Sequence, residues 1–234
     1  MEQMLEALLQ GLPGLGLELP EDCCRRLCTF GEAVVRQNAV MNLTAITNPV
    51  QVARLHLLDS LTVLTALDLR GKSVIDVGCG AGFPGVPLKI ACPELRLTLL
   101  DSLGKRITWL REIALPELGI QAECVTARAE EAVSTCRESY DVAVSRAVAR
   151  LQVLLELTAP YVQVGGRVVA MKGAAAAEEL EAAKNAISQL GLRLERTVDF
   201  PLEGTAHTLI LLRKERPTPP RYPRKFSKIK QSPL

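Results

Sequence analysis

The residues best suited to bind a small molecule form the glycine-rich run from Asp76 to Gly85, which reads DVGCGAGFPG. Glycines let a backbone turn sharply and approach a ligand without a Cβ atom in the way. The run directly follows a short β-branched segment and precedes a stretch with helical spacing. The first amides of such a helix favour negative charge. The run therefore predicts a ligand-binding loop between a strand and a helix, with Gly78 and Gly80 as candidate contacts.

The spacing of this loop fits two kinds of cofactor. The segment from Gly80 to Gly85 matches G-x-G-x-x-G, the fingerprint of dinucleotide binding. Asp101 lies 23 residues after Gly78 and ends the next predicted strand, where a carboxylate can take the ribose hydroxyls of either cofactor. Asp76 would repel a pyrophosphate, but it would attract the sulfonium and ammonium of S-adenosylmethionine. We therefore favour a methyltransferase. An NAD-binding oxidoreductase is the alternative, and a glycine turn without a ligand is the plainest interpretation.

The segments around the loop alternate between strand and helix patterns. Apolar and β-branched runs predict strands at 74–77, 97–101, 122–126, 141–144 and 167–171. Helical patterns lie at 84–92, 104–115, 129–136, 150–161 and 174–190. Such alternation predicts a parallel sheet. Two further strands, 193–200 and 207–213, are joined by residues 201–206, which are too few for a helical crossover, so they should form an antiparallel hairpin.

The predicted fold is α/β: a Rossmann-like methyltransferase sheet, mostly parallel, with an antiparallel C-terminal hairpin. Apolar spacing in residues 1–70 predicts a helical segment before the sheet. Residues 71–213 are expected to form the cofactor-binding domain, and residues 214–234 an extended C-terminal tail. Every charged residue from Arg216 onward is basic, and prolines recur among them. A solvated tail without a partner is the plain alternative to nucleic-acid binding.

The composition excludes several classes of protein. Apolar residues make up 48% of the chain and charged residues 23%, which fits a folded core rather than a disordered chain. The sequence has neither a signal segment nor an apolar run long enough to span a bilayer, so we expect no membrane partner. Scattered single cysteines indicate reduced thiols and a cytoplasmic protein. Cys23, Cys24 and Cys28 lie closer together, but both histidines are far away in sequence, so we expect no metal.

Several motifs together resemble one family, from about residue 20 to the C-terminus. They are NLTAIT from Asn42, HLLDSL from His56, the glycine-rich run, LDSLGKR from Leu100, SRAVA from Ser145, MKG from Met171 and YPRK from Tyr222. This combination is similar to the RsmG (GidB) family of bacterial 16S ribosomal RNA guanine-N7 methyltransferases. Many methyltransferases share the glycine run, whereas its combination with DSLGKR and YPRK is specific.

The resemblance implies S-adenosylmethionine as cofactor and, as substrate, the guanine at nucleotide 527 of 16S ribosomal RNA in bacterial numbering. The partner would be this RNA or the 30S subunit. The implied cofactor contacts are Gly78, Phe83, Asp101, Ser102, Leu103, Ala129, Glu130 and Arg146. Phe83 replaces a leucine common in relatives, which matters little for a backbone contact. Glu130 would accept a hydrogen bond from the adenine amine. Arg146 would hold the cofactor carboxylate or an RNA phosphate. The plain interpretations are an acid at a helix start and a surface arginine.

The implied reaction needs little from the protein beyond positioning. Guanine N7 has a free lone pair and requires no deprotonation, so we expect no catalytic residue. Lys172, after the fifth strand, is a weaker candidate for RNA binding. His56 is expected to pack between helices and Trp109 to lie in the core. A non-catalytic RNA-binding protein on the same fold remains an alternative, although the intact loop and Asp101 argue against it.

The C-terminal tail is expected to bind RNA. Its candidate contacts are Arg221, Tyr222, Arg224 and Lys225, because aromatic rings stack on bases while basic groups meet phosphates. Deletion of residues 217–234 is expected to lower RNA methylation and to leave cofactor binding near normal.

Overall fold

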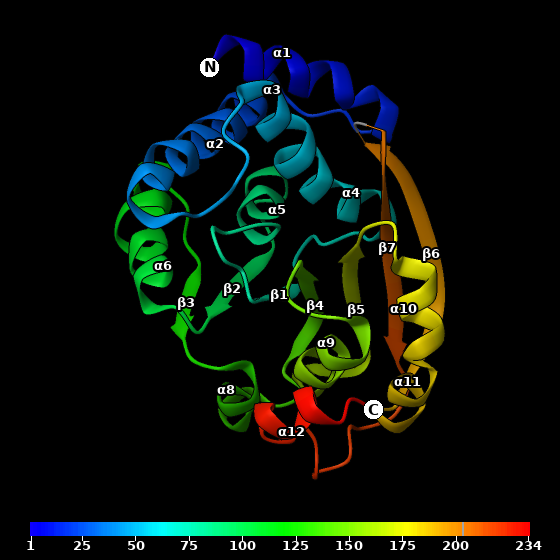
Figure 1. Cartoon of the computed structure of the whole chain (residues 1–234). Helices are drawn as coiled ribbons and strands as arrows, with labels where there is room; N and C mark the ends of the chain where they lie inside the picture. Colours follow the sequence, from blue (N-terminus) through cyan, green and yellow to red (C-terminus); the bar gives the residue numbers. More distant parts are fainter. Residues whose placement is uncertain (203) are drawn as a thin grey trace.

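The computed structural model describes residues 1–202 and 204–234, and its centre is a single twisted sheet (Figure 1). In the described residues the sheet has seven strands in the order β3-β2-β1-β4-β5-β7-β6. The strands are β1 (Ser73–Val77), β2 (Arg96–Asp101), β3 (Glu123–Thr126), β4 (Tyr140–Arg146), β5 (Val162–Lys172), β6 (Leu192–Leu202) and β7 (Thr205–Lys214). Strands β1 to β5 pair in parallel, and β7 pairs antiparallel with both β5 and β6. The predicted fold class is thereby confirmed. The predicted connection 201–206 is shorter than expected, and its residue 203 lies outside the described part.

Helices cover both faces of the sheet because strand side chains alternate between the faces. One core contains Val74, Leu97, Leu99, Val142 and Val144. The other core contains their neighbours in sequence, Ile75, Leu100 and Ala143, and also Val168 and Ala170 of β5. The helices of the first face are α1 (Glu2–Gly11), η1 (Pro13–Leu15), α2 (Glu21–Met41), α3 (Pro49–Val52), the π-helical turn η2 (Ala53–Leu58), α4 (Asp59–Ala66), α5 (Gly85–Ala91), α6 (Gly104–Trp109), the π-helical turn η3 (Leu110–Ala114) and α7 (Leu115–Glu117). The helices of the second face are α8 (Ala129–Cys136), α9 (Leu151–Thr158), η4 (Ala159–Tyr161), α10 (Ala176–Ala182) and α11 (Lys184–Gln189).

The N-terminal helices share their core with the sheet. Phe30 of α2 is fully buried, and its ring lies 5.1 Å from that of Phe83, which follows the glycine loop. Trp109 is 3% exposed in the same core. The helical segment predicted for residues 1–70 is therefore packed directly on the sheet. No helix of the described residues is both long and apolar enough to cross a membrane.

The C-terminal segment, residues 214–234, is not the extended tail that its composition predicted. It folds back over the second face and ends in the short helix α12 (Phe226–Gln231) beside α9 (Figure 1). Tyr222 is 4% exposed and Ile229 is fully buried. Arg137 donates hydrogen bonds to the carbonyls of Thr218 and Tyr222, each at 2.8 Å. The prediction was wrong because buried partners in the sheet domain neutralise and hold part of the basic segment.

Candidate functional site

The glycine loop connects β1 to α5 in a conformation that depends on its glycines. Gly78, Gly80 and Gly82 have φ angles of +74°, +56° and +98°. At Gly82 a Cβ atom would also approach side-chain atoms of Val86 and Phe30 to within 2.8 and 3.1 Å. The loop is tied to the next strand because the amides of Gly78 and Cys79 both donate to the carbonyl oxygen of Leu100. The sequence therefore builds a tight turn at the carboxyl edge of the sheet, where ligands bind in folds of this kind.

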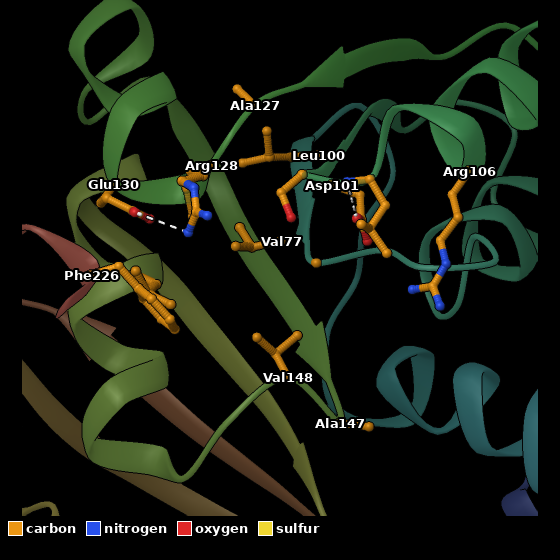
Figure 2. Close-up of a pocket in the computed structure, with 15 residues that line it drawn as sticks. Val77, Leu100, Asp101, Arg106, Ala127, Arg128, Glu130, Ala147, Val148 and Phe226 are labelled. Carbon is orange, nitrogen blue, oxygen red and sulfur yellow. Dashed lines mark hydrogen bonds and ion pairs between the residues drawn. The ribbon is translucent and has the colours of Figure 1, made fainter. Parts of the chain in front are cut away.

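A cavity of about 330 Å³ opens at this edge, beside the ends of β1 and β2 (Figure 2). The predicted contacts that line it are Gly78, Asp101, Ser102, Leu103, Ala129 and Glu130. Sequence reasoning missed Val77, Leu100, Arg106, Ala127, Arg128, Ala147, Val148, Leu157 and Phe226. Helical spacing and basic charge could have suggested Arg106, four residues after Ser102, whereas nothing local to Phe226 indicates that it reaches the cavity.

Asp101 lies in the middle of this cavity (Figure 2). Its side chain is 8% exposed, and each carboxylate oxygen accepts one backbone hydrogen bond. Oδ2 accepts from the amide of Gly80 at 2.9 Å, and Oδ1 accepts from the amide of Leu103 at 2.8 Å. A carboxylate oxygen can accept more than one hydrogen bond, so both oxygens keep capacity for a ligand. Asp101 thus connects the glycine loop to the loop after β2 and presents a negative charge to the cavity.

Asp76 lies behind the loop and does not line the cavity. The residue is fully buried, and its Oδ2 accepts a hydrogen bond from the amide of Gly85 at 2.8 Å. Its Oδ1 has no hydrogen-bond partner in the described residues. Burial raises the pKa of this carboxyl to about 7. The local role of Asp76 is therefore to fix the start of α5, and any effect on a cofactor must act through the electric field.

Phe83 and Arg146 also lie away from the first cavity. The Arg146 guanidinium packs 5.0 Å from the centre of the Phe83 ring, and the His56 ring lies 4.8 Å from the same centre. Arg146 Nη1 donates to Asp59 Oδ2 at 2.8 Å and to the Leu55 carbonyl at 3.0 Å. These contacts attach the end of β4 to the turn between α3 and α4.

The cluster around Arg146 also contains Asp59 and two histidines, His56 and His207. Asp59 is 4% exposed, and its Oδ1 lies 2.9 Å from Nδ1 of His207. Burial alone would raise the pKa of Asp59, but the His207 hydrogen bond and the Arg146 charge bring it below its usual value. Burial, together with Arg146, lowers the pKa of His56 to about 4. His56 is therefore neutral at physiological pH, and it packs against Phe83 and Thr44 rather than between helices as expected.

A second cavity of about 940 Å³ adjoins the first (Figure 2 shows the shared wall). Ala147 and Val148 line both cavities, and Val148 lies directly over Gly78. Arg146 and Lys172 line the second cavity, along with His56. Lys172 is held in place by Glu179 at 2.7 Å and by the Ala149 carbonyl at 2.5 Å. The site therefore offers two adjoining cavities, and each is lined by both acidic and basic side chains: Asp101, Glu130, Arg106 and Arg128 in the first, and Asp59, Glu179, Arg146 and Lys172 in the second.

The cysteines pack as apolar residues. Cys24 and Cys28 are fully buried, and burial raises the pKa of Cys28 to about 12. All seven cysteines are free thiols. The described ranges hold no group of three or more side chains placed to ligate a metal.

The pKa of Asp76 leads to a prediction for stability. The pKa of Asp76 is about 7 in the folded protein, which exceeds the usual 3.8. Its protonated carboxyl therefore contributes fully to the unfolding free energy below about pH 3.8, and this contribution is lost as the pH rises through about 7. Asp76→Asn keeps an oxygen for the Gly85 amide but cannot ionise. Between about pH 5 and pH 8.5, the wild type should lose roughly 2–3 kcal/mol more unfolding free energy than the variant. Urea unfolding at both pH values measures this, and parallel pH profiles would contradict it.

Comparisons with solved structures identify the class to which this sheet and loop belong. The mitomycin 7-O-methyltransferase MmcR is 19% identical, with a TM-score of 0.57 over 79% of this chain and 60% of the other. An S-adenosylmethionine-dependent methyltransferase from Aquifex aeolicus is 18% identical, with a TM-score of 0.54 over 68% of this chain and 92% of the other. The fold is that of the Rossmann-like methyltransferases.

Sequence comparisons then place the chain within that class. Residues 23–207 match the family described as rRNA small subunit methyltransferase G. A ribosomal RNA small subunit methyltransferase G from Alkaliphilus oremlandii is 42% identical over 238 residues, covering 99% of both chains. One from Bacillus cytotoxicus is 48% identical over 202 residues, covering 84% of both chains. The chain belongs to the rRNA small subunit methyltransferase G family. This confirms the resemblance and favours a ribosomal RNA methyltransferase over both alternatives.

Proposed function

We propose that this protein transfers a methyl group from S-adenosylmethionine to N7 of the guanine at nucleotide 527 of 16S ribosomal RNA, in bacterial numbering. The observation that carries the proposal is the pair of adjoining cavities that meet at Ala147 and Val148. The smaller one is suited to the cofactor and the larger one to the acceptor. The family assignment supports an acceptor in small-subunit ribosomal RNA.

The residues of the first cavity fit S-adenosylmethionine, which when bound supplies an electrophilic methyl group on a sulfonium. Asp101 is placed to accept from the ribose hydroxyls. Glu130, whose side chain is 11% exposed, is placed to accept from the adenine amine. Arg106 lines the cavity near Gly80 and suits the carboxylate of the methionyl part. A volume of about 330 Å³ is at the lower end of the range for small-molecule sites.

The second cavity fits an acceptor that needs orientation rather than proton transfer. Its walls include apolar side chains of Leu55 and Met171, suited to a base face, and the cations Arg146 and Lys172, suited to phosphate. The lone pair of guanine N7 is available without a base, so alignment and exclusion of water are the work required. The two acids of the described residues that line this cavity, Asp59 and Glu179, are paired with Arg146 and Lys172.

RNA contacts from the C-terminal segment are proposed for the exposed Arg221 and Lys225. Tyr222 and Arg224, which were predicted to join them, are used within the protein. The Tyr222 hydroxyl donates to Gln189, and Arg224 is paired with Glu156. The partner is 16S ribosomal RNA, free or in the 30S subunit, and the free thiols fit a cytoplasmic location.

Methyl transfer from labelled cofactor tests the proposal directly. Naked 16S RNA, free 30S subunits and intact ribosomes are offered in parallel, each with guanine or adenine at nucleotide 527. Label that depends on the guanine supports the proposal, and its mapping to N7 identifies the atom. Label that is indifferent to this nucleotide would contradict the assigned target, while leaving the family assignment untouched.

Cofactor affinity of the Asp101→Ala variant tests the cofactor assignment. Hydrogen bonds to a charged group contribute roughly 1.5–3 kcal/mol, so calorimetry should show binding weakened by about ten- to a hundredfold. Asp101→Asn is the matched control for shape, because its amide oxygen can still accept from the Gly80 amide. NADH is titrated alongside: tight binding of NADH, or unchanged S-adenosylmethionine affinity in a folded Asp101→Ala protein, would overturn the assignment.

A further inference from the structure

Phe226 reaches the first cavity from the far end of the chain. It is the first residue of α12, whereas every other lining residue lies between Val77 and Leu157. Its side chain packs beside Val153, Leu157 and Ile229 and also faces the cavity. Figure 2 shows its ring directed into the open space beside Glu130. An aromatic ring that is packed on one side and open to a ligand cavity on the other is a wall of that cavity.

The C-terminal segment is held so that Phe226 keeps this position. Two residues earlier, Arg224 donates to both oxygens of Glu156, at 2.8 Å from Nε and 2.6 Å from Nη2. The backbone amide of Arg224 donates to the same carboxylate at 2.9 Å. Glu156 is fully buried in α9. On the other side, Ile229 is fully buried against α9. The ring is thus fixed between two anchors.

The order of groups along the cavity indicates what Phe226 would contact. Asp101 lies in the middle, Arg106 and the glycine loop lie on one side, and Glu130 and Phe226 lie on the other (Figure 2). With the ribose at Asp101, the methionyl part extends toward Gly80 and Arg106. The adenine then extends toward Glu130 and Phe226. A flat aromatic base and an aromatic side chain stack favourably.

We propose that Phe226 contacts the adenine of the cofactor, so that the C-terminal segment forms part of the cofactor site. This inference rests on the proposed cofactor, and it departs from the expectation that residues 217–234 are dispensable for cofactor binding. Phe226 positions the cofactor and takes no part in methyl transfer.

Calorimetry with two ligands tests the inference. S-adenosylhomocysteine contains the whole cofactor skeleton, and 5′-methylthioadenosine contains only its adenosine half. Phe226→Ala should weaken both by about tenfold or more, because stacking on a base is lost. Phe226→Tyr, which keeps an aromatic ring, should bind both within about threefold of the wild type. If Phe226→Ala does not fold, Phe226→Leu fills similar volume and should still weaken both ligands.

Ile229→Ala is the matched control, because it removes a buried side chain from the same helix without touching the cavity. It should lower the midpoint of thermal unfolding and leave both affinities within about threefold. Equal losses of affinity in Ile229→Ala and Phe226→Ala would overturn the direct contact, and so would unchanged affinity in Phe226→Ala or Phe226→Leu. A wild type that binds neither ligand would instead refute the proposed cofactor, and the inference with it.

Discussion

Replacing Gly80 by valine is expected to abolish cofactor binding, with affinity lowered by at least about a hundredfold. Gly80 has a φ angle of +56°, a conformation that β-branched residues adopt only with strain. Steric crowding does not prevent a side chain at this position, since among the described residues an added Cβ would meet only Arg106 Nη1, at 3.7 Å. The loop would relax to negative φ and withdraw the Gly80 amide from Asp101 Oδ2. Calorimetric titration with S-adenosylhomocysteine measures the loss.

Gly119 supplies a control with the same backbone conformation. Its φ angle is +60° and nothing in the described part of the chain lies within 4 Å of an added Cβ. Neither glycine lines either cavity, but the Gly119 amide donates to the Pro116 carbonyl, whereas the Gly80 amide donates to Asp101 of the first cavity. Gly119→Val should therefore lower thermal stability about as much as Gly80→Val does, while its cofactor affinity stays within about threefold of the wild type. If the Gly80→Val protein still binds and methylates, the loop is only a turn.

Arg224→Ala is expected to cost about 3–5 kcal/mol of unfolding free energy, because it leaves a buried carboxylate without its cation. Glu156 is fully buried, and the Arg224 side chain is 22% exposed. The amide of residue 224 still donates to Glu156 in the variant, which favours the lower end of the range. Chemical denaturation monitored by circular dichroism measures the change.

The neighbouring Lys225 is the comparison, because it is exposed. Lys225→Ala should change unfolding free energy by no more than about 0.5 kcal/mol. It should instead weaken RNA binding and reduce its salt dependence, as expected for the loss of one phosphate contact. Equal stability of the two variants would show that the Arg224 pair does not hold the C-terminal segment in place.

The parts of the fold that could be predicted from sequence are those determined by local patterns. The continuous apolar runs of β1 and β2 and the short connection between β6 and β7 are visible in neighbouring residues. The glycine loop and Asp101 were recognisable for the same reason, since turn geometry and strand ends leave signals within a few positions. Asp101 and Gly80 were expected to face one ligand, and their hydrogen bond places them together.

The parts that could not be predicted depend on partners distant in sequence. No residue near Arg224 in the sequence shows that Glu156 is buried and pairs with a cation. Charge counting therefore assigned Arg224 to RNA and missed that Phe226 lines the cavity. Arg146 was placed correctly at the end of β4, but its pairing with Asp59 depends on how the N-terminal helices pack. Residue type and strand position do not specify such contacts.

The return of the C-terminal segment to the cavity has a consequence for biosynthesis. Residues 222–229 are translated after every strand of the sheet, yet Tyr222 and Ile229 are buried and Phe226 lines the first cavity. A nascent chain that has already formed its sheet still lacks one wall of this cavity. We therefore expect a nascent chain that has not yet produced α12 to bind the ligand more weakly than the complete protein does.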